Sequence, residues 1–170
     1  MFFYLKEDYI DYVLNVIAKV KLKNNINKVT QIQIQKIIYI VYSYFLIFKS
    51  KIANIKFETW KWGPVIYKLW KNHTQYSKSN VPLIFNKKED LKIDNNFSSE
   101  NTIVYEIIKF LLNLKYWDIV LICHEQTPWK KLYKPSRNNL ITDQDILKFH
   151  NENNNNFFEY IDFIVKNVLK

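Results

Sequence analysis

A single glycine, Gly63, occurs among the 170 residues of this chain, and only four residues are proline. Glycine and proline supply many of the tight turns that connect short strands, so a turn-rich β fold is disfavoured. A chain of this length suits one domain with one core. The scarcity of turn residues therefore predicts a mainly α fold, a single compact helical domain with one or two short extended segments.

Apolar residues recur every three or four positions in several segments, which is the spacing of amphipathic helices. The segment from Gln31 to about Lys49 is apolar on nearly every side after Ile37, so we expect its helix to lie in the centre of the core. Thr30 precedes it as the expected N-cap. The other segments with this spacing are residues 6–23, 98–114, 118–123, 142–150 and 157–168.

Two stretches depart from helical spacing, residues 52–62 and 81–85, and we expect short extended segments there. Between them, Gly63 is expected to allow a backbone turn that a side chain would block. Pro64 is expected at the first position of a helix that ends near His73, because proline has no N–H to leave unsatisfied there.

Tryptophan is concentrated beside this expected turn. Trp60 and Trp62 lie two positions apart, which would place them on one face of an extended segment. There they would hold the turn against the long helix that contains Gln35 and Lys36. Large rings in a small helical domain usually belong to the core, although tryptophan is also enriched at protein interfaces. Burial is therefore the favoured expectation, with an interface as the second.

The asparagine-rich run NENNNN, residues 151–156, has the low complexity of a linker. It separates an expected helical domain, residues 1–150, from an expected C-terminal helix, residues 157–170. No internal repeat occurs in the sequence.

Several sequence features favour a cytoplasmic protein without membrane contact. The longest apolar run, residues 37–48, is shorter than the roughly 20 residues needed to cross a bilayer. The first residues do not combine a basic start with an apolar run, as a signal peptide would. Cys123 is the only cysteine, so no disulfide forms within the chain, which suits a reducing compartment.

The formal net charge is +9, and a basic chain suits binding to nucleic acid. Arg137, however, is the only arginine among 25 basic residues. Proteins that read base sequence depend on arginine, whose fork fits guanine. A chain with one arginine is therefore not expected to recognise a specific base sequence. Nucleic acid is thus not the expected partner. A nucleic-acid-associated helical regulator from a mobile element is kept as the alternative function.

Residues that could carry chemistry gather at Cys123, His124 and Glu125, with His73 and His150 distant in the sequence. Neighbouring positions on a helix point about 100° apart, so the adjacent cysteine and histidine cannot easily share a metal ion or act as a nucleophile–base pair. A carboxylate beside a histidine could act as an acid–base pair, but such pairs are also common on solvated helix ends. One glycine cannot build a phosphate-binding loop. We therefore expect no metal, no cofactor and no enzymatic activity.

Three segments in a fixed order carry a family resemblance: IQKIIYIVYSYFLIF, then FETWKWGPVIYKLW, then LICHEQTPWKKLY followed by ITDQDILKFH. They resemble the SocA-like antitoxin family, whose domain is called Panacea and whose pattern is L-Q-K-L-L-Y, F-x-A-W-x-x-G-P-V and T-H-x-E-x-P-W. The resemblance extends over roughly residues 28–150. The chain departs from this pattern at three positions. Thr59 stands where the family often has alanine, and Cys123 replaces the threonine that precedes the histidine. The acid, Glu125, directly follows His124, one place earlier than in the family.

The resemblance implies a mostly helical antitoxin that neutralises a co-encoded protein toxin by direct protein–protein contact. Members of the family are not known as enzymes, and some are thought to hand the toxin to a cellular protease. Trp62, Trp129 and the neighbouring Lys61, Lys130 and Lys131 are a narrower hypothesis for the binding surface. The family-motif and candidate toxin-binding residues are Gln35, Lys36, Trp60, Trp62, Gly63, Pro64, His124, Glu125, Pro128 and Trp129.

Overall fold

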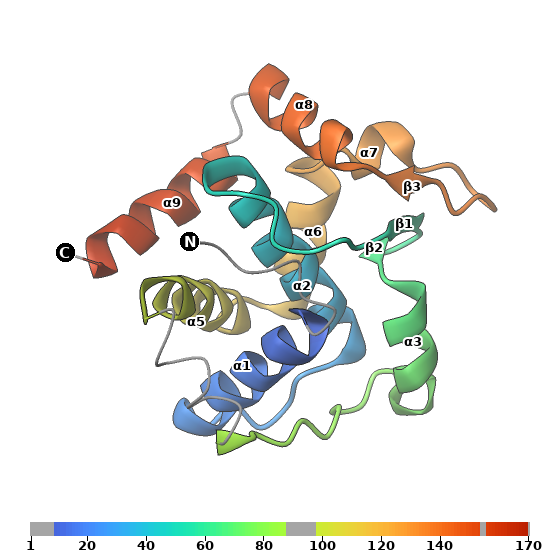
Figure 1. Ribbon diagram of the computed structural model, residues 1–170. Coiled ribbons are helices and arrows are strands. Elements are labelled where there is room, and N and C mark those ends of the chain that lie inside the picture. Colours follow the sequence, from blue (N-terminus) through green and yellow to red (C-terminus); the bar gives the residue numbers. More distant parts are fainter. Residues whose placement is uncertain (1–8, 88–97, 154–155, 170) are drawn as a thin grey trace.

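The computed structural model describes residues 9–87, 98–153 and 156–169 (Figure 1). Most of them are helical, which confirms the mainly α prediction. The helices are α1 (Tyr9–Lys23), α2 (Gln31–Phe48), α3 (Tyr67–His73), the 3-10 turn η1 (Thr74–Tyr76), α5 (Ser98–Leu112), α6 (Tyr116–Glu125), α7 (Trp129–Leu132), α8 (Asp143–Asn153) and α9 (Asn156–Val168). The strands are β1 (Phe57–Trp60), β2 (Gly63–Val65) and β3 (Leu140–Ile141).

Helix α2 lies in the middle of the molecule, where it contacts α1, α5, α6, α8, α9 and strand β2 (Figure 1). Its side chains are buried almost all round between Gln31 and Phe45. Thr30 caps its start: the Gln33 backbone N–H donates to the Thr30 hydroxyl, and the Thr30 backbone N–H donates to Gln33 Oε1. The central position predicted from the apolar run and the N-cap predicted at Thr30 are both confirmed.

A small antiparallel sheet in the order β2-β1-β3 packs beside α2. Strand β1 falls within the predicted extended segment and pairs Trp60 with Gly63 across a two-residue turn. Strand β3 is contributed by a distant part of the chain and pairs Ile141 with Phe57. It was not expected from the sequence, because two residues are too short to show strand alternation.

The prediction that Pro64 begins a helix is wrong. Pro64 lies inside β2, and α3 begins three residues later at Tyr67. Strand β2 is an edge strand of the sheet, and an edge strand accepts proline because one side of it makes no ladder hydrogen bonds. The turn also separates Trp60 from Trp62, so the two indoles do not share a face as expected.

Residues 81–85 are not part of the sheet. Val81 is nevertheless buried, and its backbone N–H donates to the Val29 carbonyl oxygen at 2.9 Å. This hydrogen bond holds the segment against the residues that precede α2.

The last two helices pack onto the same core. Helix α8 begins with a capping box, in which the Asp145 carboxylate accepts from the Thr142 backbone N–H at 2.8 Å and the Asp145 backbone N–H donates to the Thr142 hydroxyl at 3.2 Å. Residues 151–153 form the end of α8, and residues 154–155 of the expected linker lie outside the described residues. Helix α9 places Phe158, Ile161 and Val165 in the core. The division into residues 1–150, 151–156 and 157–170 therefore stays a prediction.

None of the helices in the described part of the chain combines the length and the apolar character needed to cross a membrane.

Candidate functional site

The residues of the family pattern meet where the β1–β2 turn packs against α2 and α6. We call residues 57–70 the tryptophan corner. Gly63, at its centre, has φ +99°, in the left-handed region that side chains rarely adopt. A Cβ placed on Gly63 would lie 2.8 Å from Lys36 Cε and 3.4 Å from Cys123 Cβ. The only glycine of the chain is therefore needed both for its conformation and for the close approach of α2.

Lys36 projects from α2 into this corner and is 1 % exposed. Its ammonium donates to the Pro64 carbonyl oxygen at 2.8 Å. Burial lowers the pKa of Lys36 to about 8, because removing the charge from water is costly, although the nearby Cys123 thiol acts in the opposite direction. Burial raises the pKa of Cys123 to about 12, with Lys36 acting against the shift, so this thiol stays protonated at neutral pH.

Two glutamines of α2 hold the backbone that follows the turn. Gln35 Oε1 accepts from the Ile66 backbone N–H at 2.8 Å, and its Nε2 donates to the Ile66 carbonyl at 3.3 Å. Gln31 Nε2 donates to the Trp70 carbonyl at 2.9 Å. The Gln-Lys pair of the family pattern, Gln35 and Lys36, thus bonds backbone groups of Pro64 and Ile66, between the short β2 strand and α3.

Trp129 connects the end of α6 to the tryptophan corner. Its indole N–H donates to the Trp60 carbonyl oxygen at 2.8 Å, and the side chain is 9 % exposed. The ring stacks between His124, at a centroid distance of 3.8 Å, and Tyr133, at 4.6 Å. Pro128 precedes it as the N-cap of the short helix α7. Trp129 therefore offers little surface to a partner, contrary to its place in the expected binding surface.

His124 is a packing residue in this arrangement. Burial, together with the positive charge of Lys36, lowers its pKa, while Glu125 acts to raise it. A neutral imidazole is consistent with the face-to-face stacking on Trp129. The Glu125 carboxylate instead pairs with Lys130, 2.9 Å away, at an exposed position. The adjacent histidine and glutamate therefore do not form the acid–base pair considered from the sequence.

Trp60 covers the turn from the side of α3. Its ring lies 4.9 Å from that of Trp70 and 6.4 Å from that of Tyr67, and its indole N–H donates to the Glu58 carboxylate. The side chain is half-buried. It was expected to pack on α2, but Lys36 and Gln35 take that role.

Trp62 is the member of the set that faces outward. It is 43 % exposed, and Lys61 Nζ lies 4.8 Å from its ring centroid. Its ring edge contacts Trp117, at a centroid distance of 5.5 Å, and Trp117 is itself 49 % exposed. Sequence reasoning missed Trp117. The contact joins residues far apart in the chain, and the only signal was that a fifth tryptophan remained unassigned.

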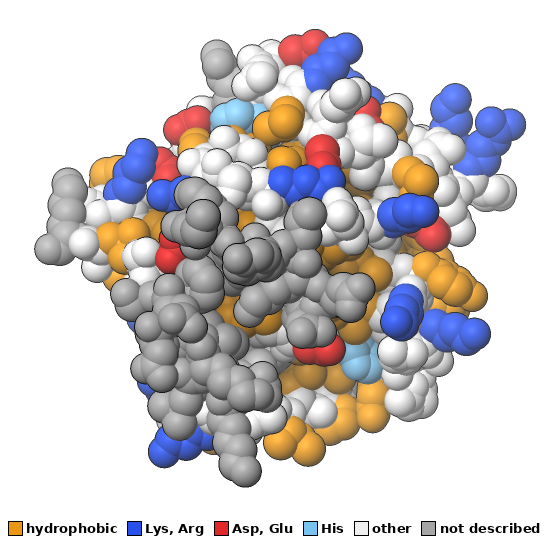
Figure 2. All heavy atoms as spheres, viewed as in Figure 1, with side chains coloured by type: hydrophobic (Ala, Val, Ile, Leu, Met, Phe, Trp, Pro, Cys, Tyr) orange, Lys and Arg blue, Asp and Glu red, His pale blue; other side chains and the backbone are white. Residues whose placement is uncertain are grey.

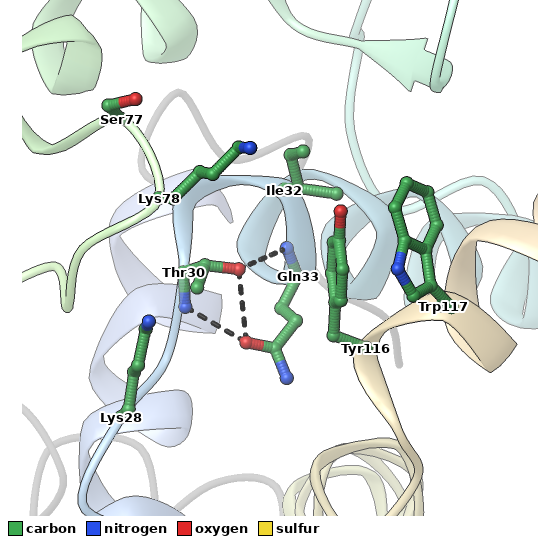
Figure 3. A pocket seen from close by; sticks show the side chains of 8 residues that line it. All are labelled: Lys28, Thr30, Ile32, Gln33, Ser77, Lys78, Tyr116 and Trp117. Atoms are coloured by element: carbon green, nitrogen blue, oxygen red, sulfur yellow. Dashed lines mark hydrogen bonds between the residues drawn. The ribbon is translucent and has the colours of Figure 1, made fainter.

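A pocket of about 450 Å³ adjoins Trp117 (Figure 3). It lies between the approach to α2, the segment after η1 and the first turn of α6. The residues that line it are Lys28, Thr30, Ile32, Gln33, Ser77, Lys78, Tyr116 and Trp117.

Metal ligation has no support in the described ranges, where no three His, Cys, Asp or Glu side chains lie close enough together to hold an ion. His73 packs beside Tyr76, and His150 lies near Glu159 and Phe48. The two distant histidines are thus brought neither to each other nor to Cys123. Rings, amides and the buried Lys36 ammonium pack together at the tryptophan corner, and the exposed Trp62 lies at its edge.

Comparison with known proteins gives one result. No curated protein and no solved structure matches the chain. A family model described as "Antitoxin SocA-like, Panacea domain" matches residues 34–130, which is more than half of the sequence and includes most of α2, the tryptophan corner and α6. The chain therefore belongs to the SocA-like antitoxin family and carries its Panacea domain.

Proposed function

We propose that this protein is an antitoxin that neutralises a co-encoded protein toxin by binding it directly. The family match over residues 34–130 is the observation that carries the proposal. In this proposal the family-pattern residues build the scaffold, and partner contact falls to exposed side chains around them.

The geometry of the corner supports a binding role without chemistry. The polar groups of Gln35 and Lys36 are directed at backbone atoms of the same chain. The Cys123 thiol is buried with a raised pKa, which makes it a poor nucleophile. We propose accordingly that neutralisation involves no enzymatic step and takes place in the cytoplasm, where the toxin is made.

A co-expression experiment tests the proposal. The open reading frame next to this gene is placed under one inducible promoter and this protein under another. We expect induction of the neighbouring gene alone to stop growth, and induction of both to restore colony numbers. Growth arrest that persists with this protein present at equal or higher level would contradict the proposal.

The control for co-expression is a protein that is translated but unfolded. Ile38→Asp is expected to provide one, because it would place an unpaired carboxylate at a position of the core that is fully buried. Rescue by the wild type and not by this variant shows that the folded protein, rather than its transcript, is needed.

We also propose that the complex is presented to a cellular protease, as the family resemblance implies. The half-life of the toxin, followed after translation is blocked, tests this step separately. Toxin that disappears faster with the antitoxin than without it supports delivery to a protease. An unchanged or longer half-life, together with rescue of growth, leaves direct binding as the whole mechanism.

Nucleic-acid binding is the alternative that the net charge suggests. On the face shown in Figure 2, the lysine and arginine side chains lie scattered and do not form one continuous stripe. A gel-shift series against salt separates the two functions. Tight binding to DNA that weakens steeply as salt rises would favour the alternative.

A further inference from the structure

The strongest unassigned feature of the surface is the pocket that adjoins Trp117. Its volume of about 450 Å³ is large enough for several side chains of a bound segment. Figure 3 shows Tyr116 and Trp117 together on one side, Thr30 and Gln33 in the middle, and Lys28 and Lys78 on the other side. The pocket therefore presents an aromatic side and a basic side to whatever enters it.

The described lining of the pocket carries charge of one sign. Two exposed lysines belong to it, and none of the lining residues that the structure describes is acidic. The first turn of α2, which forms its middle, contains no acidic residue either. The partial positive charge of a helix N-terminus is thus not offset by an acid of the same turn. An occupant with carboxylates would be attracted from both directions.

Gln33 adds a hydrogen-bond donor. The residue is 8 % exposed, and its Oε1 accepts from the Thr30 backbone N–H, which fixes the orientation of the amide. The amide Nε2 points away from these capping bonds (Figure 3) and has no hydrogen-bond partner among the described residues. An amide donor without a partner among the described residues, beside a pocket, suits an occupant that brings an acceptor.

The aromatic side extends beyond the pocket. Trp117 contacts Trp62, and Lys61 lies over the Trp62 ring, so the basic and aromatic character continues to the tryptophan corner. Tryptophan is enriched among the interface residues whose loss weakens binding most. We call Lys28, Lys78, Tyr116, Trp117, Trp62 and Lys61 the aromatic–basic patch.

Stacked bases of single-stranded nucleic acid fit the patch less well. Base stacking requires an open ring face. Here Lys61 lies over the Trp62 ring, and the Tyr116 and Trp117 rings lie against each other with centroids 4.4 Å apart. The partner that suits both the charge and the partly covered rings is a protein segment with acidic and bulky apolar side chains.

Resting on the proposed function, we propose that the aromatic–basic patch binds an acidic segment of the toxin. An apolar side chain of that segment enters the pocket beside Tyr116 and Trp117. Its carboxylates pair with Lys28, Lys78 and Lys61. The Gln33 amide donates to a carbonyl or carboxylate oxygen of the same segment.

A charge-reversal experiment tests this assignment. The toxin is the neighbouring gene product, recovered from its complex by unfolding and refolded. Its affinity is measured by calorimetry for the wild type, for Lys28→Glu with Lys78→Glu, and for Lys49→Glu with Lys56→Glu. The two double variants have the same net charge. The control lysines are exposed and follow the C-terminal end of α2, whereas the pocket lies at its N-terminal end. We expect the first pair to weaken binding by at least about tenfold and the second by less than about threefold.

An aromatic pair completes the test. Trp117→Ala is compared with Phe163→Ala, which removes a ring that is 63 % exposed on α9. We expect about tenfold weaker toxin binding for the first variant and no change for the second. Circular dichroism and the unfolding midpoint show that each variant is folded.

The outcomes separate the two proposals. If the wild type binds the toxin and both patch variants bind it equally well, the assignment of the patch is overturned while the antitoxin function stands. If the wild type does not bind the toxin, both are overturned. If the patch variants lose binding to a thymine oligonucleotide and keep toxin binding, the patch is a nucleic-acid site and the assignment is again wrong.

Discussion

Lys36 carries an ammonium group into the interior, and its surroundings explain how the fold tolerates it. The group donates a hydrogen bond to the Pro64 carbonyl oxygen and lies close to the Cys123 thiol and to the only glycine of the chain. Burial lowers its pKa from the ordinary value of 10.5 to about 8. Between these two values the unfolded chain holds the proton more tightly than the folded chain does.

The first prediction concerns this lysine and pH. Because the folded pKa is lowered, stability rises as pH increases from about 8 to about 10.5, by up to about 3 kcal/mol from this group. Buried tyrosines and Cys123 act in the opposite direction above pH 9, so the difference between wild type and Lys36→Met is the quantity to measure. Urea unfolding at several pH values gives it. Lys68→Met, at an exposed position, is the control, and a difference that stays flat would contradict the account.

The second prediction concerns Gly63. An alanine there would be strained at φ +99°, and its Cβ would lie 2.8 Å from Lys36 Cε. We expect Gly63→Ala to lower the free energy of unfolding by about 2–3 kcal/mol. Part of this cost is the contact with the lysine, so the double variant with Lys36→Ala should lose less than the sum of the two single variants. Additive losses in urea unfolding would show that the contact does not matter.

The third prediction separates the tryptophans. Trp129 is enclosed by two stacked rings and bonded to Trp60 O, whereas Trp62 is 43 % exposed. We expect Trp129→Ala to cost about 3–5 kcal/mol of stability and Trp62→Ala less than about 1 kcal/mol. Thermal unfolding followed by circular dichroism measures both. Equal losses would mean that the environments of the two rings are not as described.

At the scale of elements, α9 packs on the centre of the fold through its apolar face and also through a buried hydrogen bond to α2. The Tyr44 hydroxyl donates to Asp162 Oδ1 at 3.0 Å, and Asp162 also pairs with Lys166. Asp162 is 5 % exposed. Burial and the adjacent carboxylate raise the pKa of Tyr44, so the hydroxyl remains a donor at neutral pH.

The fourth prediction follows from that pair. Tyr44→Phe keeps the ring and leaves the buried carboxylate without its tyrosine donor, so we expect a loss of about 1–3 kcal/mol. Hydrogen exchange should speed up in α9 more than in α1. Tyr160→Phe, on the same helix and 52 % exposed, is the matched control and should change neither quantity. Equal exchange in the two variants would show that the pair does not hold the helix.

The elements also show how far the sequence could be used. Helix α2 was predictable because its apolar run is long and its cap lies next to it in sequence, so all of its signals are local. The position of Pro64 was not predictable, because a helix N1 position and an edge strand both accept proline. Only the pairing of β1 with β2 decides between them. The ladder of β3 on β1 and the contact of Trp62 with Trp117 join distant segments, which no local pattern indicates.

For the candidate site, the sequence located the right segments and left their roles to the structure. The family pattern brought together Gln35, Lys36, Gly63 and Trp129, and these residues do meet. The pattern could not distinguish residues that hold the corner together from residues that face outward. That distinction depends on burial, which places Trp129 inside and leaves Trp62 at the surface.

At the scale of the whole molecule, a packed helical core carries a corner whose polar groups are directed inward and an aromatic–basic patch that faces solvent beside it. Such an arrangement suits recognition of another protein. The net charge of +9 would speed the approach of an acidic toxin at low salt, and we expect the association rate to fall as salt is added.

The most direct test of the central claim is a calorimetric titration of this protein with the purified product of the neighbouring gene. The account predicts a saturable complex with a dissociation constant below about 1 µM, formed without nucleotide, metal or nucleic acid. The absence of binding at protein concentrations of about 50 µM, tens of times that dissociation constant, would contradict it.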